Sequence, residues 1–168
     1  MAHRKSQRLR FKRRRNGRTD YRRRMRMLRG GVPRAVVRVS NTQVTCQLVE
    51  FKMDGDNILA SVTGNTLAKY GWPSGASRKS VPACYVAGYA LAKSAIAAGH
   101  DSAILDIGLA ASSPCSRIFA SLKGMVDAGL EVPHGENVLP DDDRINGTHI
   151  DDSIATAVEA AKKASEGA

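Results

Sequence analysis

Arginine side chains are concentrated at the start of the chain. Residues 1–38 contain fourteen arginines, two lysines and a single carboxylate, Asp20, so this segment has a net charge of +15. Residues 39–168 contain ten basic and fifteen acidic side chains, a net charge of −5. The planar guanidinium group of arginine binds a phosphate through two parallel hydrogen bonds and also stacks on bases. The chemistry that this segment favours is therefore the binding of a polyanion.

The polyanion could be a nucleic acid, an anionic membrane or an acidic protein. Membrane binding requires large apolar side chains beside the charges, and residues 3–18 offer only Leu9 and Phe11. An import signal would account for five or six charges but not for sixteen. The excess of arginine over lysine favours nucleic acid as the partner, and neither a membrane nor a small-molecule substrate is expected.

Two aromatic residues lie among these arginines. Phe11 and Tyr21 are candidates for stacking on the unpaired bases of a structured RNA. They could also anchor the segment to the body of the protein. Both roles stay open for Tyr21, because it falls on an apolar stripe with Met25 and Leu28 at helical spacing.

Few other residues could do chemistry. Asp141 to Asp143 could bind Mg²⁺, although their spacing is more typical of a solvated turn. Ser112 to Cys115 could bind a phosphate at the start of a helix, or could simply cap it. The three cysteines and four histidines show no metal-ligand spacing. The residues favour binding over catalysis, and no cofactor is expected.

Elements that would position the arginines can be predicted from the pattern. In the basic segment, Thr19 is expected to cap a short helix that ends at Gly30 and Gly31. Residues 34–40, 43–51 and 58–63 alternate apolar and polar side chains or are rich in β-branched ones. The short turns between them predict a three-stranded antiparallel meander.

Helical patterns dominate the second half of the chain. Ser80 should cap a helix that runs to Gly99, residues 103–107 form a buried strand, and Ser112 or Ser113 opens a second helix. A strand, a crossover helix and another strand imply a parallel pair. A final helix is expected from Asp151 to about Ser165.

The predicted fold is α/β: a three-stranded antiparallel meander followed by an α-β-α layer, which is the order of elements in ribonuclease H-like enzymes. Such nucleases hold metal ions with several carboxylates. Residues 34–40 and the helix at 81–98 contain none, and only Asp106 occupies a matching strand. One carboxylate cannot hold two metal ions, so Asp106 is better explained as a strand-end carboxylate bonded to neighbouring backbone.

Three parts of the chain follow from these patterns. We expect a basic RNA-binding arm at 1–33, an α/β core domain at 34–132, and a C-terminal loop and helix at 133–168. No apolar run approaches the length of a membrane span, and no apolar signal segment follows the basic start. The expectation is a soluble, intracellular protein.

Long irregular motifs carry a family resemblance. The stretches DIGLAASSPCSRIFASLKGMVDAGLEVPHG, VLPDDDRINGTHI, RLRFKRRRNGRTDYRRRMRMLRGGVPRAVVRVSN and TGNTLAKYGWPSGASRKSVPACYVAGYALAKSAIAAG strongly resemble ribosomal protein family eighteen of the large subunit. The eukaryotic counterpart of this family is numbered five. The resemblance covers nearly the whole chain and is to the archaeal form.

This resemblance implies a non-enzymatic protein that binds 5S rRNA and attaches it to the large rRNA near the central protuberance. It would act in the cytoplasm, within the large ribosomal subunit and beside other ribosomal proteins. The arm and part of the sheet surface are implied to contact RNA. The residues predicted to bind RNA are Arg4, Lys5, Arg8, Arg10, Phe11, Lys12, Arg13, Arg14, Arg15, Arg18, Tyr21, Arg22, Arg23, Arg24, Arg26, Arg29 and Arg34.

Charge alone does not separate this function from a general one. A nucleic-acid packaging protein would also present a strongly basic arm, and it would bind duplex DNA and 5S rRNA equally well. An RNA preference at moderate salt distinguishes the two hypotheses.

Overall fold

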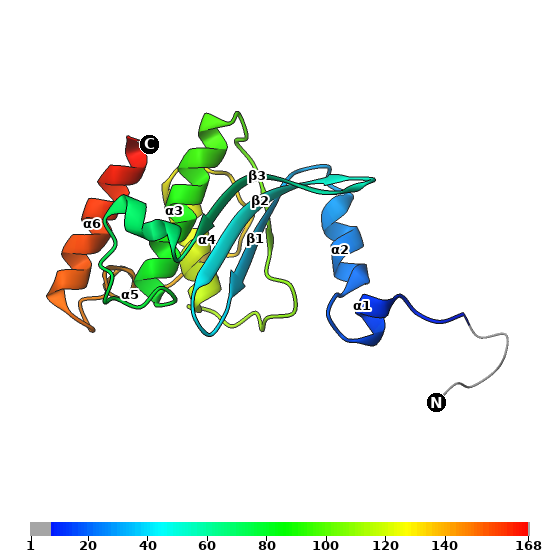
Figure 1. Ribbon diagram of the computed structural model, residues 1–168, viewed down its shortest axis with the longest axis horizontal. Helices are drawn as coiled ribbons and strands as arrows, with labels where there is room; N and C mark the ends of the chain where they lie inside the picture. The colour runs from blue at the N-terminus through cyan, green and yellow to red at the C-terminus, as the bar shows by residue number, and fades with distance from the viewer. Residues whose placement is uncertain (1–7, 168) are drawn as a thin grey trace.

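The computed structural model describes residues 8–167 (Figure 1). Two of the predicted RNA-binding residues, Arg4 and Lys5, lie outside the described residues. The elements, in chain order, are α1 (Lys12–Arg15), α2 (Tyr21–Leu28), β1 (Arg34–Val39), β2 (Val44–Lys52), β3 (Gly55–Thr63), the 3-10 helix η1 (Thr66–Tyr70), α3 (Val81–Ala97), β4 (Ile104–Asp106), α4 (Arg117–Asp127), the 3-10 helix η2 (Glu136–Val138), α5 (Asp142–Asn146) and α6 (Asp152–Glu166).

The four strands form one mixed sheet in the order β3-β2-β1-β4. β1 pairs with β2 and β2 with β3 in antiparallel fashion, whereas β4 pairs with β1 in parallel, with Val36 opposite Asp106. A parallel partner for β1 requires a crossover, and α3 supplies it. The prediction of an α/β fold is confirmed, with a sheet that is mixed as a whole. The likeness to ribonuclease H-like enzymes in the order of elements stays a prediction, as does the division into three parts.

The core helices α3 and α4 cover one face of this sheet. α3 contacts β2 and β3, and α4 contacts β1. α6 packs on α3 from the side away from the strands, so Figure 1 shows α6, then α3 and α4, then the sheet, and finally α2. The core side chains of the sheet, among them Val37, Cys46 and Leu48, point toward the helices and are fully buried. The opposite face of the sheet is left for α2 and the arm.

Two glycines let α3 and α4 approach each other closely. A Cβ atom on Gly88 would overlap the carbonyl oxygen of Ser121, and one on Gly124 would overlap that of Tyr85. The neighbours are backbone atoms, which cannot move aside as a flexible side chain can. The small residues of α3 therefore set the spacing of the helical layer behind the sheet.

We expect Gly88→Ala to lower the free energy of unfolding by roughly 3 kcal/mol, because the added methyl group forces the two helices apart. Urea denaturation of the wild type and of Gly88→Ala measures this difference in the free energy of unfolding. Gly75→Ala is the matched control, since a Cβ atom there has no neighbour within 4 Å. Equal stability of the two variants would show that α3 and α4 are not packed this closely.

The C-terminal helix is held on α3 by polar contacts to two tyrosines. The hydroxyl of Tyr89 donates to Glu166 at 2.7 Å, and the ammonium group of Lys162 lies 4.8 Å from the ring centre of Tyr85. Tyr85 also donates to Asp127 on α4 at 2.8 Å. Burial and the carboxylates of Glu166 and Asp127 raise the pKa of Tyr89 to about 12, so its contact with Glu166 involves a neutral phenol at physiological pH.

Several predicted helix boundaries are wrong. Asp20, not Thr19, caps α2, because its carboxylate accepts from the backbone amides of Arg22 and Arg23. The second helix behind the sheet begins after Ser116 rather than after Ser112 or Ser113. The left-handed backbone at Cys115, with φ of 55°, delays its start.

Other segments hold more helix than predicted. The part of 133–168 before the final helix, predicted as a loop, contains η2 and α5. The single turn of α1 has no counterpart in the prediction either. In the described part of the chain, no helix combines the length and apolar character that crossing a membrane requires.

Candidate nucleic-acid interface

The uncovered face of the sheet carries polar and basic side chains. Successive side chains of a strand point to opposite faces, so Arg34, Val36 and Arg38 of β1 share the face that the core helices do not cover. Gln47 and Phe51 of β2 lie on the same face, opposite Ser61 and Asp56 of β3. Figure 1 shows α2 standing over this face, beneath the long β2–β3 hairpin.

A chain of ion pairs joins α2 to the sheet. Arg24 of α2 contacts Asp56 of β3 at 2.8 Å, and Asp56 contacts Arg34 of β1 at 2.7 Å. Arg34 in turn contacts Asp106 of β4 at 2.8 Å, and Asp106 contacts Arg38 at 2.9 Å. These five residues, called the ion-pair chain below, alternate in sign across three strands. The arrangement fixes both the position of α2 and the orientation of Arg38.

Arg34 does not fit its predicted role. Its side chain is 3% exposed, and both of its terminal nitrogens are paired with carboxylates. A guanidinium group that is buried and paired in this way is not free to bind an RNA phosphate. The sequence did not reveal this, because Asp56 and Asp106 lie 22 and 72 positions away.

The carboxylates of the ion-pair chain are ionised at physiological pH. Burial by itself raises the pKa of Asp106, but hydrogen bonds from Arg38, the Gly108 amide and Arg34 outweigh burial and leave the pKa below its ordinary range. Asp56 shows the same balance, with Arg24 and Arg34 as the donors. Both carboxylates therefore stabilise the fold in their charged form.

Acid should weaken this network. A carboxylate whose pKa is lower in the folded chain contributes stability above its unfolded pKa of about 3.9, and this contribution is lost as the pH falls through the folded pKa. The free energy of unfolding should thus decrease below about pH 4. Asp106→Asn should lower stability at neutral pH and flatten this acid-dependent decrease, which urea titrations between neutral and acid pH can measure.

The comparison of the wild type with Asp106→Asn isolates the contribution of the ion-pair chain to the acid dependence of stability. Asp20, Asp142 and Asp151 also have lowered pKa values, but they are retained in the variant and affect both profiles equally. Identical acid profiles for the wild type and Asp106→Asn would contradict the prediction.

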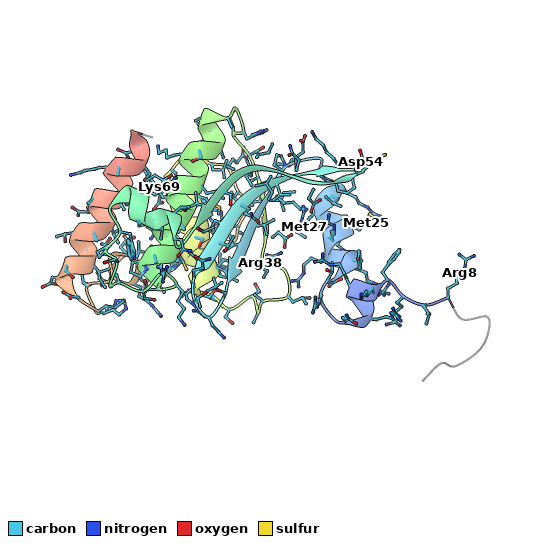
Figure 2. All side chains as sticks on the ribbon, viewed as in Figure 1. Arg8, Met25, Met27, Arg38, Asp54 and Lys69 are labelled. Atoms are coloured by element: carbon cyan, nitrogen blue, oxygen red, sulfur yellow. The ribbon has the colours of Figure 1, made fainter. Side chains whose placement is uncertain are left out.

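Between α2 and the open face lies a groove with a volume of about 760 Å³. Figure 2 shows Met27 on the side of α2 toward the strands and Met25 on the opposite side. Met25 is accordingly 58% exposed, so this member of the predicted stripe of Tyr21, Met25 and Leu28 does not rest on the body of the protein. The groove is lined by Arg13, Arg18, Thr19, Asp20, Tyr21, Arg23, Arg24, Met27, Arg34, Val36, Arg38, Gln47, Val49, Phe51, Lys52, Met53, Asp54, Gly55, Asp56, Ile58, Asp106, Gly108 and Leu109.

The basic residues of the arm form an exposed array beside this groove. Arg23 donates to the Gly108 carbonyl at 2.9 Å, and Arg13 donates to the Thr19 hydroxyl at 3.1 Å. Arg24 is partly committed to the ion-pair chain, with 29% of its side chain exposed. The other predicted residues in the described part of the arm are exposed: Arg8, Arg10, Phe11, Lys12, Arg14, Arg15, Arg18, Arg22, Arg26 and Arg29.

The two aromatic residues of the arm contact each other. The ring centres of Phe11 and Tyr21 are 5.5 Å apart, and Tyr21 is half-buried while Phe11 is 73% exposed. This pairing links the chain before α1 to the start of α2. Anchoring of the arm is thus one observed role of both rings, and the exposed part of Phe11 stays available to a base.

Of the basic and aromatic residues that line the groove, the sequence prediction missed three: Arg38, Phe51 and Lys52. Arg38 could have been found, because strand alternation places it on the same face as Val36. Phe51 could have been found from its spacing to Gln47. Lys52 gave no signal, since its approach to the groove depends on how the β2–β3 hairpin bends over α2.

The alternative chemical sites take up structural roles. Asp106 accepts from the Gly108 amide at 2.8 Å, as expected for a strand-end carboxylate, and is further occupied by two arginines. Asp142 pairs with Lys123 of α4. All three cysteines are free thiols. Among the side chains that the structure describes, no three from His, Cys, Asp or Glu lie together as metal ligands would.

A family model described as "Ribosomal large subunit proteins 60S L5, and 50S L18" matches residues 5–102 and 97–135, more than half of the chain. The chain belongs to this family. The resemblance inferred from the sequence motifs is thereby confirmed. The matched residues include the arm from residue 5, the whole sheet and α4, whereas α5 and α6 follow the matched region.

Individual relatives named uL18 are similar to this chain over most of its length. Large ribosomal subunit protein uL18 of Methanobrevibacter smithii is 51% identical over 140 residues, which cover 83% of this chain and 72% of the relative. The protein of the same name from Methanothermobacter thermautotrophicus is 47% identical, covering 89% and 77%. That from Methanothrix thermoacetophila is 43% identical and covers 91% and 92%. These relatives are archaeal, as predicted, and are named as ribosomal proteins rather than enzymes.

Proposed function

We propose that this uL18-family chain is a structural protein of the archaeal large ribosomal subunit that binds 5S rRNA. It attaches that RNA to the large rRNA at the central protuberance. The observation that carries this proposal is the segregation of charge: +15 in residues 1–38 and −5 in the rest. In the described residues, the arm, α2 and the open face of the sheet lie together at one end of the molecule (Figure 1).

RNA contact would be divided between the arm and the sheet. The exposed arginines of α1 and α2 bind phosphates, and each neutralised phosphate releases counterions and so adds to the affinity. Arg4 and Lys5 belong to this set on the basis of sequence alone. The ion-pair chain does not contact phosphate through Arg34, but it holds α2 and Arg38 in place before the RNA arrives, which lowers the ordering cost of binding.

The acidic body would face other components of the subunit. Asp141 to Asp143, Asp151 and Asp152 lie near or within α5 and α6, at the end of the molecule far from the arm. Their charge disfavours RNA and suits basic neighbouring ribosomal proteins. The protein would thus act in the cytoplasm, with RNA at one end and proteins at the other.

A competition assay tests the RNA preference. At moderate salt, unlabelled 5S rRNA should displace a labelled 5S rRNA from the chain at concentrations at least about a hundredfold lower than duplex DNA of the same length does. The physical reason is that a fixed sheet face and a fixed α2 match one RNA shape, whereas a purely electrostatic arm does not discriminate. Equal competition by the two nucleic acids would favour a general packaging protein instead.

A further inference from the structure

The groove between α2 and the sheet is not filled by the protein itself. α2 is tied to the strands by Arg24 and by the Arg23 contact to Gly108, and the apolar side chains below it remain open. Phe51 is 51% exposed and Ile58 is 53% exposed. The volume of about 760 Å³ lies within the range of pockets that bind small organic groups, roughly 300–1,000 Å³.

The charge of the lining selects an anionic occupant. The lining contains six arginines and one lysine against four aspartates. Asp56 and Asp106 are neutralised within the ion-pair chain, and Asp20 accepts two backbone amides. The fourth carboxylate, Asp54, is exposed at the tip of the β2–β3 hairpin. Arg13 and Arg18 form no ion pair with any carboxylate among the described residues. These two cations of the groove are therefore available to a phosphate.

The same lining offers an apolar surface beside those cations. Phe51 of β2 and Ile58 of β3 come from neighbouring strands of the hairpin, and Tyr21 at the start of α2 faces the same groove. The ring of Tyr21 is held by its contact with Phe11. Aromatic surface next to arginine is the combination that binds an unpaired base and its phosphate. Bases inside a paired RNA helix are stacked and cannot enter such a groove.

We propose that the groove binds an unpaired nucleotide of RNA. Its base lies against Phe51 and Ile58, and its phosphate is bound by arginines that line the groove. This inference rests on the proposed RNA-binding function and adds to it a site that requires a nucleotide outside a helix. An acidic protein segment would use the cations but would gain little from a flat apolar surface, so RNA is the better match.

The test uses the full chain and two RNA hairpins that differ by one bulged nucleotide. Phe51→Ala should weaken binding of the bulged hairpin about tenfold or more and leave binding of the fully paired hairpin unchanged. Ile58→Ala should act in the same direction with a smaller effect. Ile150→Ala is the matched control, because Ile150 is also 53% exposed but does not line the groove; it should affect neither hairpin.

Other outcomes overturn the site. Equal losses on both hairpins, or no loss on either, would show that no unpaired nucleotide binds there. Displacement of the bulged hairpin by a poly-glutamate peptide from the wild type but not from Phe51→Ala would assign the groove to a protein partner. If Phe51→Ala fails to fold, photo-crosslinking of a bulged thiouridine to the wild-type chain decides: crosslinks outside residues 13–24 and 47–58 contradict the proposal.

Failure of the site and failure of the proposed function are distinguishable. If only the site is wrong, the wild-type chain still binds 5S rRNA with a strong salt dependence, and the variants match it. If the function is wrong, the wild-type chain shows no preference for 5S rRNA over duplex DNA, whatever the result with the hairpins.

Discussion

A chain that begins at Val32 should bind 5S rRNA several orders of magnitude more weakly than the full chain at low salt. The truncation removes fourteen of the sixteen basic residues in positions 1–38. If the arm neutralises on the order of six to ten phosphates, affinity in the full chain falls by roughly three to five decades between about 50 and about 200 mM salt. The truncated chain should lose most of that dependence. Titrations at several salt concentrations measure both quantities.

Substitutions in the full chain separate the charge from the length of the arm. Changing Lys12, Arg14 and Arg15 together to glutamine should reduce the slope of log affinity against log salt by roughly two to three. The matched control changes Lys69, Arg144 and Lys163 to glutamine. These three are also exposed and basic, and Lys69 lies near α6 at the opposite end of the molecule (Figure 2). Similar slopes for both triple variants, or an unchanged slope after truncation, would contradict RNA binding by the arm.

Arg34→Met should lower the free energy of unfolding by about 3–5 kcal/mol. The substitution leaves Asp106 buried at 4% exposure with only Arg38 as its charged partner, and it removes a second partner from Asp56. The loss comes mainly from the buried carboxylate oxygen that Arg34 leaves without its donor, because Arg38 and the Gly108 amide contact the other oxygen of Asp106. The double variant Arg34→Met with Asp106→Leu should recover most of the stability, because it removes both buried charges. Chemical denaturation of the single and double variants measures this.

An exposed ion pair provides the control for this prediction. Lys52 and Glu50 lie 3.7 Å apart and are 61% and 47% exposed, so Glu50→Gln should change the unfolding midpoint very little. If Arg34→Met is as stable as the wild type and loses affinity for RNA, then Arg34 contacts RNA as the sequence suggested.

Local patterns predicted most of the strands and long helices. Strand alternation placed β1 and β2 to within one or two residues, and Ser80 caps α3 as expected, with its hydroxyl accepting from the Ala83 amide. These features depend on residues within a few positions of one another, so local sequence patterns can predict them. The start of α4 was missed because a left-handed residue at Cys115 is not favoured by its side chain.

The same local patterns could not predict contacts between residues that are far apart in the sequence. Met25 and Met27 are two positions apart on α2, and only the direction of the sheet decides that Met27 faces the groove. Gly88 and Gly124 looked like ordinary small residues of two helices. Their importance arises from the crossing of α3 and α4, in which each glycine meets the backbone of the other helix.

Residue types alone indicated a polyanionic partner. The formal charge of a side chain is nearly independent of the fold, so +15 in the arm and −5 in the body follow directly from the residue types. The tertiary structure decided which of those charges are free. Asp56 and Asp106 reach Arg34 only because β3, β1 and β4 lie in one sheet, and this pairing turns one expected RNA contact into a buried support for the others.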